Sequence, residues 1–179
     1  MAPAETGRVG PVVLVGPMGA GKSTVGRRLA AALGWDFLDS DQEIVRRTGA
    51  DISLIFEKEG EVGFRRRERE VIAELLGRDR LVLATGGGAV LEADTRQRMK
   101  ERALVVYLTA SVDQQFRRTR KDTHRPLLNV ADPLARLAAL QVCRDPLYRE
   151  VASLCVDTDR QQPAAVAADI LAVLPWHGV

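Results

Sequence analysis

Residues 16–23, with the sequence GPMGAGKS, restrict the fold of this chain more than any other segment, because they fit the pattern G-x-x-x-x-G-K-[ST]. They directly follow an apolar run at 11–15 and precede a stretch with helical spacing that ends at Gly34. The glycines let successive backbone N–H groups turn towards a phosphate at the helix N-terminus. The segment predicts a binding site for a nucleoside triphosphate.

Lys22 and Ser23 add the chemistry that such a phosphate-binding loop needs. The lysine supplies a cation to the outer phosphates, and the serine hydroxyl can bind Mg²⁺. The alternative interpretation, in which residues 16–23 are only a turn that joins a strand to a helix, is disfavoured because the complete motif occurs between a predicted strand and a predicted helix. Kinases, GTPases, motors and transport ATPases share the loop, so it predicts the ligand class and not the reaction.

The composition narrows the class of protein. A chain of 179 residues with 46% hydrophobic residues can bury one core, so we expect one domain. The net charge of +2 gives no general basic field for nucleic acid. No uncharged apolar run approaches the roughly 20 residues that span a bilayer, so we expect a soluble cytoplasmic protein without membrane contacts. Cys143 and Cys155 are expected to be buried free thiols.

Short apolar runs alternate with helical stretches along the chain, which predicts an α/β fold. Runs rich in valine and leucine, separated by amphipathic helices, are typical of a parallel sheet covered on both faces. In such folds ligands bind beyond the carboxyl ends of the strands. The runs are at residues 12–15, 37–38, 81–83, 104–108 and 154–156.

Two of these runs end in residues that suit a binding site. Asp39 and Asp41 follow the second run, where one carboxylate can hold Mg²⁺ through water and the other can polarise an acceptor hydroxyl. The alternative, which spacing alone favours, is that Asp41 only caps a helix at 42–47 and Asp39 lies on the surface. Glycines 86–88 follow the third run and allow a ligand to approach the backbone, whereas a merely flexible connection would explain fewer glycines.

Two arginine-rich segments have both a structural and a functional interpretation. Residues 64–70 lie on a predicted helix, where most charges are solvated or paired and one arginine can turn inward to bind an anion. Residues 117–128 begin as a basic and polar run, which Pro126 interrupts. This second segment suits a lid over the transferring phosphoryl group, or it is a solvated loop.

Taken together, these residues make the chain resemble shikimate kinases from residue 12 to about residue 174. The resemblance rests on six motifs in the family's order: GPMGAGKST at 16–24, DSD at 39–41, GE and FR at 60–61 and 64–65, GGG at 86–88, RPLL at 125–128 and RDPLY at 144–148. It implies ATP-dependent phosphorylation of the shikimate 3-hydroxyl on the pathway to the aromatic amino acids. Another small hydroxy acid such as gluconate, or a nucleotide-dependent switch, remains the alternative.

The resemblance also implies roles for individual residues. The implied catalytic residues are Asp41, Lys22 and Arg125, with Arg125 reaching the phosphates from the lid. Ser23 and Asp39 would hold Mg²⁺. ATP would contact Gly19, Ala20, Gly21, Lys22, Ser23, Thr24, Arg118, Arg125 and Gln161, and shikimate would contact Asp41, Arg65, Gly87, Gly88 and Arg144.

The family's architecture completes these expectations. It implies a phosphate-loop three-layer α/β/α fold, like that of the nucleoside monophosphate kinases, with a five-stranded parallel sheet in the order 2-3-1-4-5. Residues 1–179 would form a single domain and act as a monomer. Within it we expect a substrate-binding subdomain at about 41–69, a lid at about 121–132, and loose tails at 1–10 and 175–179.

Overall fold

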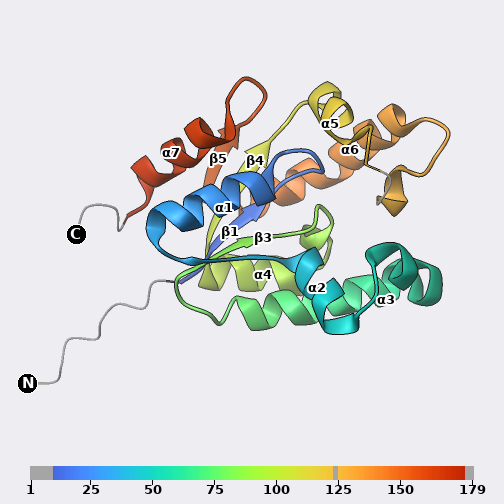
Figure 1. Ribbon diagram of the computed structural model, residues 1–179, viewed down its shortest axis with the longest axis horizontal. Coiled ribbons are helices and arrows are strands. Elements are labelled where there is room, and N and C mark those ends of the chain that lie inside the picture. The colour runs from blue at the N-terminus through green and yellow to red at the C-terminus, as the bar shows by residue number, and fades with distance from the viewer. Residues whose placement is uncertain (1–9, 123–124, 176–179) are drawn as a thin grey trace, which may run out of the picture.

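The computed structural model describes residues 10–122 and 125–175. Within them, parallel strands form a five-stranded sheet in the order β2-β3-β1-β4-β5 (Figure 1). The strands are β1 Val12–Val15, β2 Asp36–Asp39, β3 Leu81–Ala84, β4 Leu104–Thr109 and β5 Leu154–Asp157. The predicted α/β class and the implied strand order are both confirmed.

Helices connect the strands and cover the sheet. They are α1 Lys22–Leu33, α2 Ser40–Thr48, α3 Ile52–Leu75, α4 Ala93–Arg102, α5 Val112–Thr119, α6 Pro133–Val151 and α7 Pro163–Val173, with short 3₁₀ turns η1 Ala89–Leu91 and η2 Pro126–Leu128. The helices expected before Gly34, at 42–47 and around 64–70 are α1, α2 and α3. The expected tails at 1–10 and 175–179 lie largely outside the described residues, as do positions 123–124 of the expected lid.

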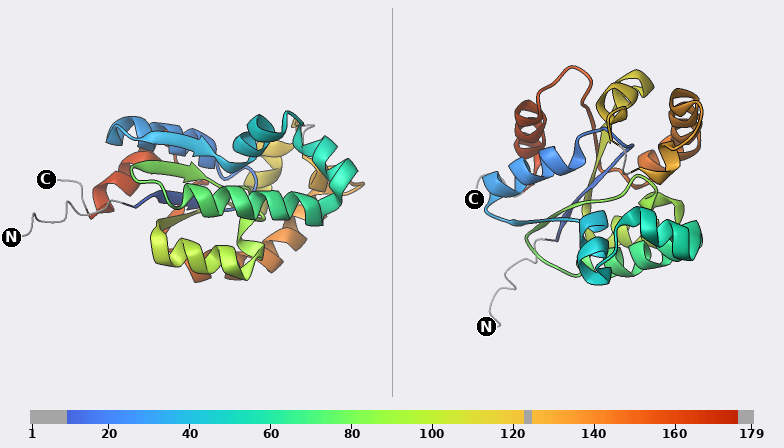
Figure 2. Two further views of the ribbon diagram at one scale, coloured as in Figure 1. Left: turned by 90° about the horizontal axis from the view of Figure 1, so that it is seen from below. Right: turned by 45° about the vertical axis from the view of Figure 1, so that its right-hand side comes forward.

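The central strand β1 shows why its sequence is a continuous run of apolar residues. Val13 and Val15 pack in a core with residues of α3, α4 and α6, whereas Val12 and Leu14 pack on the opposite face with α1 and α7 (Figures 1 and 2). Successive side chains of a strand point to opposite faces, so a sheet covered on both sides needs apolar residues at every position.

The strand register gathers the expected site at one edge of the sheet. Ala84 of β3 lies opposite both Leu14 of β1 and Asp39 of β2. Because the strands are parallel, the segments that follow β1, β2 and β3 leave the sheet side by side. The phosphate-binding loop, the aspartates and the glycines at 86–88 therefore meet.

Helix α3 contains a sharp kink at Gly60, whose φ of 68° is unfavourable for residues with a side chain. The rings of Phe56 and Phe64 pack across this kink with centroids 4.9 Å apart. Arg67 donates two hydrogen bonds to Glu59 across it, at 2.9 and 2.6 Å. The kink folds the first part of α3 back towards the carboxyl edge of the sheet.

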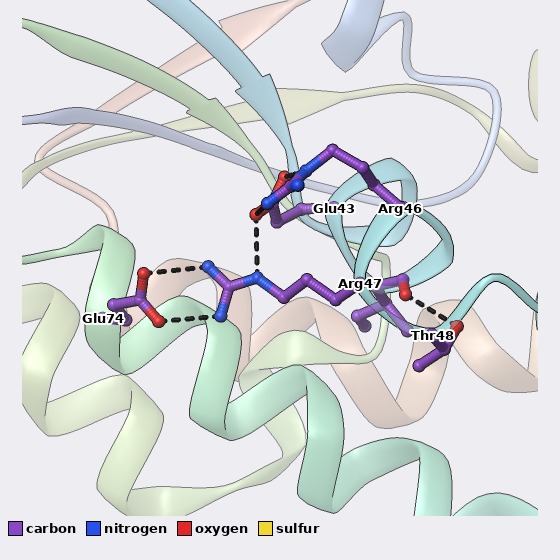
Figure 3. Close-up of polar contacts among 6 residues, drawn as sticks. Glu43, Arg46, Arg47, Thr48 and Glu74 are labelled. Carbon is purple, nitrogen blue, oxygen red and sulfur yellow. Dashed lines mark hydrogen bonds and ion pairs between the residues drawn. The ribbon is translucent and has the colours of Figure 1, made fainter.

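Arg47 ties the end of α2 to the far end of α3. Its guanidinium donates to both carboxylate oxygens of Glu74, at 2.7 and 2.9 Å, and its Nε donates to Glu43 at 2.8 Å (Figure 3). Arg46 adds two further hydrogen bonds to Glu43. The helices that carry Asp41 and Arg65 are thus linked by ion pairs as well as by apolar packing.

The expectation of buried cysteines was wrong. Cys143 and Cys155 are both free and exposed. Cys143 lies on the outer side of α6, and Cys155 lies on β5, which is an edge strand with little cover. No helix in the described part of the chain is long and apolar enough to cross a membrane.

Candidate active site

The phosphate-binding loop joins β1 to α1 in a conformation that depends on glycine. Gly19 and Gly21 have φ values of 75° and 86°, in the left-handed region that other residues avoid. Gly21 is the N-cap of α1, and no side chain caps this helix. The N–H groups of its first turn are therefore available to an anion.

Lys22 is folded back onto its own loop. Its Nζ donates to the carbonyl oxygens of Gly16 and Pro17, both at 2.8 Å. Burial, followed by repulsion from Arg125, lowers the pKa of Lys22 to about 8. Asp41 and Asp39 partly offset this decrease, but no carboxylate among the described residues forms an ion pair with the ammonium group.

Asp39, rather than Asp41, caps α2. Its Oδ1 accepts hydrogen bonds from the N–H groups of Asp41 at 2.9 Å and Gln42 at 3.2 Å, while its Oδ2 accepts one from the Ser23 hydroxyl at 2.6 Å. The alternative in which Asp41 only caps the helix and Asp39 lies on the surface is therefore wrong. A carboxylate at the N-cap satisfies free N–H groups itself, which leaves the side chain of Asp41 available.

Asp41 turns into the protein instead of towards solvent. Its Oδ1 is buried and has no hydrogen-bond partner among the described residues. Burial, together with the nearby carboxylates of Glu68 and Asp39, raises the pKa of Asp41 to about 7. A carboxyl group with a pKa near neutrality can accept a proton from a bound group and release it again.

Arg65 is the arginine of the 64–70 segment that turns inward, as expected for one of them. It is 9% exposed, and its Nη1 donates to Glu68 at 2.6 Å while its Nη2 donates to Glu61 at 3.3 Å. Its Nε is buried with no partner in the described structure. The guanidinium therefore keeps donor capacity for a further anion.

Glu68 is a site residue that the sequence analysis missed. It is 2% exposed, its Oε1 has no partner among the described residues, and burial raises its pKa in spite of Arg65. The only signal in the sequence was its position three residues after Arg65 on the same helix. The helix contains several other charged residues, so this spacing did not single it out.

Glycines 86 and 88 leave room for site side chains that approach the backbone closely. A Cβ at Gly86 would lie 2.6 Å from Oε1 of Glu68 and 2.9 Å from Oδ1 of Asp41. A Cβ at Gly88 would overlap the guanidinium of Arg65. A flexible connection would not require glycine at these positions, so that alternative does not explain the segment.

Arg144 completes the charged part of the site from α6. It is 5% exposed, and a Cβ at Gly87 would lie 3.3 Å from its Nη1. These groups surround one cavity of about 510 Å³. Its polar lining consists of Ser23, Asp39, Asp41, Gln42, Arg65, Glu68, Gly86, Gly87, Gly88, Asp122, Arg125 and Arg144.

One wall of this cavity is apolar, which the sequence analysis did not anticipate. Phe56 and Phe64 come from the two sides of the kink in α3, and Leu127 comes from η2. Val45 and Ile52 extend the wall at the junction of α2 and α3. The cavity therefore suits a small molecule that has an apolar face as well as charged and hydroxyl groups.

Arg125 reaches the same cavity from the segment at 121–132. Its Nε donates to Asp122 at 2.7 Å, and both residues line the cavity. His124 lies outside the described residues.

A second cavity, of about 490 Å³, lies beside the N-terminus of α1. Arg118 is fixed at its edge, because its guanidinium donates to the carbonyl oxygens of Gly19 and Thr158, each at 2.8 Å. The expected nucleotide residues Ala20, Gly21, Thr24, Arg118 and Gln161 all line this cavity.

Ser23 and Asp39 are the residues that fit a magnesium ion. Their oxygen atoms lie 2.6 Å apart at the start of α1 and the end of β2. Among the described residues no group of three or more His, Cys, Asp or Glu side chains could hold a metal. Mg²⁺ commonly uses few protein oxygens together with water and phosphate, so this pair is compatible with it.

Comparisons with known proteins agree with this geometry. The family model for shikimate kinase matches residues 18–175. The chain is 55% identical to the shikimate kinase of Methylococcus capsulatus over 89% of both chains, and 58% identical to that of Pseudomonas entomophila over 89% of this chain and 93% of the relative.

Solved structures of shikimate kinases also resemble this chain. The shikimate kinase of Acinetobacter baumannii, in complex with shikimate, superposes with a TM-score of 0.89 at 55% identity over 91% of both chains. A gluconokinase from Sinorhizobium meliloti shares the fold, with a TM-score of 0.65 at 23% identity. The chain therefore belongs to the shikimate kinase family and is an ATP-using kinase of aromatic amino acid biosynthesis.

Proposed function

We propose that the chain transfers the γ-phosphoryl group of ATP to the 3-hydroxyl of shikimate in the cavity between α2, α3 and α6. One observation carries this assignment: Asp41, whose Oδ1 is buried and has no partner among the described residues, lines the same cavity as two buried arginines, Arg65 and Arg144. Shikimate has hydroxyl groups and one carboxylate on a partly unsaturated ring. The charged lining and the apolar wall are complementary to those features.

Asp41 is the proposed base. Its carboxylate accepts a hydrogen bond from the reacting hydroxyl and takes up its proton as the oxygen bonds to the γ-phosphorus and ADP leaves. The raised pKa suits this role, because a base near neutrality is both ionised and able to bind a proton. In a loose transition state, orienting the hydroxyl contributes as much as removing the proton.

Arg65 and Arg144 are proposed to bind the shikimate carboxylate, with the backbone of Gly87 and Gly88 contacting the ring substituents. Guanidinium groups match a planar carboxylate with two parallel hydrogen bonds. Glu68 holds Arg65 from behind through a 2.6 Å hydrogen bond. The carboxylate of the substrate would accept hydrogen bonds from the donor capacity that these guanidinium groups keep, such as Nε of Arg65.

The phosphate-binding loop is proposed to hold the triphosphate. The uncapped N–H groups at the start of α1 would bind its phosphates, and Lys22 would exchange the carbonyls of Gly16 and Pro17 for the transferring phosphoryl group. Arg125 adds positive charge from the lid. Arg118 and Gln161 flank the cavity proposed for the adenine.

Ser23 and Asp39 would hold Mg²⁺ beside the loop. When bound, the ion neutralises charge on the phosphate oxygens.

We also propose that the chain works as a single-domain cytoplasmic monomer, with residues 41–69 as the substrate-binding part and residues 121–132 as the lid. Sedimentation of the purified protein at assay concentration tests the monomer. Amide exchange over residues 120–132 tests the lid, which is expected to gain protection when ADP and shikimate are both present.

The deciding experiment measures ADP formation from ATP and Mg²⁺ with shikimate, quinate, gluconate or no acceptor, with product mass determined. We expect phosphorylated shikimate to form far faster than any other product. Turnover that stays at the no-acceptor level with shikimate would refute the proposed acceptor, even if ATP binds.

A further inference from the structure

Tyr148 connects two parts of the acceptor site that lie far apart in the sequence. It lies one turn after Arg144 on α6 and is 1% exposed. Its hydroxyl donates a hydrogen bond of 2.5 Å to the backbone carbonyl oxygen of Gly87, in the glycine segment after β3. One side chain thus links α6 to the backbone that faces the acceptor.

The same hydroxyl also interacts with Arg144. Both groups lie against Gly87: a Cβ there would lie 3.3 Å from Nη1 of Arg144 and 3.5 Å from the Tyr148 hydroxyl, which donates to the Gly87 carbonyl. Burial raises the pKa of Tyr148 to about 12, so the phenol keeps its proton at neutral pH and remains a donor. The hydroxyl therefore anchors the glycine backbone directly beside the guanidinium of Arg144.

The bond to Gly87 also controls the next N–H group. The described chain contains no cis peptide bond, so the carbonyl of Gly87 and the N–H of Gly88 point in opposite directions from one rigid unit. Holding the carbonyl against Tyr148 fixes the direction of that N–H. A hydrogen bond to the carbonyl also polarises the peptide and makes its N–H a better donor.

We propose that Tyr148 is a positioning residue that aligns Arg144 and the Gly87–Gly88 peptide as one unit for the acceptor. The proposal rests on the proposed function, because it assigns the acceptor to these two groups. It predicts that loss of the hydroxyl weakens the binding of shikimate and leaves the binding of ATP nearly unchanged.

Tyr107 provides a matched control. Its ring packs against that of Tyr148 with centroids 4.9 Å apart, and it is equally buried. Its hydroxyl, however, donates to Asp145 at 2.7 Å rather than to the glycine segment. The two tyrosines therefore differ mainly in where the hydroxyl points.

The test compares Tyr148→Phe and Tyr107→Phe in steady-state kinetics. For Tyr148→Phe we expect the KM for shikimate to rise about 10-fold, as for loss of a buried hydrogen bond, and the KM for ATP to change less than about twofold. For Tyr107→Phe we expect both KM values to stay within about twofold, even if the melting temperature falls. Equal changes in both KM values, or an unchanged KM for shikimate in Tyr148→Phe, would overturn the proposal.

A second measurement does not require Tyr148→Phe to fold or the enzyme to turn over. The sequence contains two tyrosines, so 3-fluorotyrosine in the Tyr107→Phe protein labels position 148 alone. We expect its fluorine resonance to shift when shikimate saturates the protein. Binding of shikimate by calorimetry without such a shift would refute the role of Tyr148, whereas absence of shikimate binding and turnover in the unmodified protein would refute the proposed function itself.

Discussion

The 510 Å³ cavity proposed for the acceptor (the acceptor cavity) and the 490 Å³ cavity proposed for the nucleotide (the nucleotide cavity) are similar in size but differ in how their charged groups are held. In the acceptor cavity, Asp41, Arg65 and Glu68 each have a buried polar atom that no described residue satisfies. In the nucleotide cavity, Arg118 is already bonded to the carbonyl oxygens of Gly19 and Thr158. The first cavity thus holds buried polar atoms without partners among the described residues, whereas the arginine of the second cavity is already paired.

This difference is relevant to specificity. Buried charges that lack partners favour a ligand that supplies those partners and reject one that does not, because the wrong ligand leaves them desolvated and unpaired. Backbone N–H groups at a helix N-terminus bind any suitable phosphate. The acceptor cavity is therefore expected to determine which molecule is phosphorylated, and the nucleotide cavity to supply a general phosphate site.

Replacing the proposed base tests the comparison most severely. Asp41→Asn keeps the shape of the side chain and removes its charge, and we expect kcat to fall by about 10²-fold or more with little change in the KM for ATP. Asp36→Asn, at the exposed opposite end of β2, is the control and should leave kcat near its original value. Turnover near the original rate in Asp41→Asn would exclude a catalytic role for Asp41.

The next largest effect is expected from the buried arginine. Arg65→Ala should raise the KM for shikimate by about 10- to 100-fold, because the substrate carboxylate loses a charge-assisted partner and Glu68 is left without its cation. The KM for ATP should change far less. Arg66→Ala removes the neighbouring exposed arginine and should change neither constant. Parallel rises in both KM values would show that Arg65 is structural.

A smaller effect, on the KM for ATP instead of the KM for shikimate, is expected from a substitution in the nucleotide cavity. Arg118→Ala should raise the KM for ATP by roughly 3- to 10-fold and leave the KM for shikimate nearly unchanged, because it removes one cavity wall and a hydrogen bond to the loop at Gly19. Arg117→Ala, one position away on α5, is the matched control. If Arg118→Ala weakened shikimate binding more than ATP binding, the assignment of one cavity to the acceptor and the other to the nucleotide would be wrong.

The smallest expected effect is on stability, at the ion pairs that link α2 to α3. Hydrogen bonds from Arg46 and Arg47 lower the pKa of Glu43 to about 2, below its ordinary value of 4.5 (Figure 3). The ionised carboxylate is therefore favoured in the folded protein, and its stabilisation is full above about pH 4.5 and is lost as the pH falls towards 2.

Glu43→Gln should accordingly lower the free energy of unfolding by about 1 kcal/mol near neutral pH. The difference from the unmodified protein should shrink below pH 4.5, as measured by urea unfolding over a pH series. Glu57→Gln, at an exposed position of α3, should show no such dependence. A difference that persists unchanged to pH 2 would mean that packing, and not charge, accounts for the effect.

Local patterns were sufficient to predict the strands, the loop and several helices. The apolar runs became the strands because burial on both faces requires apolar residues at every position. The phosphate-binding loop was predictable because its glycines, Lys22 and Ser23 act within one short segment. Cys155 was misjudged because its exposure depends on which strand forms the sheet edge, and Cys143 because its exposure depends on which side of α6 faces the sheet; the runs reveal neither.

The acceptor site was predictable only in part. Asp41, Arg65 and Arg144 were expected from the resemblance, but residue spacing alone favoured Asp41 as a helix cap, a role that Asp39 fills. Glu68 and the apolar wall of Phe56 and Phe64 gave no distinct pattern. Their importance arises from the kink at Gly60 and from contacts between segments far apart in the chain.

The sequence by itself therefore determined the α/β class, the phosphate-binding loop and the family, because each depends on residues close together or on motifs in a fixed order. Only the tertiary structure decided which buried charged side chains keep an atom that no described residue satisfies, which aspartate caps α2, and that Tyr148 reaches Gly87 across 61 positions. Burial and long-range hydrogen bonds are set by how α2, α3 and α6 pack against the sheet edge. No local pattern of residues specifies that packing.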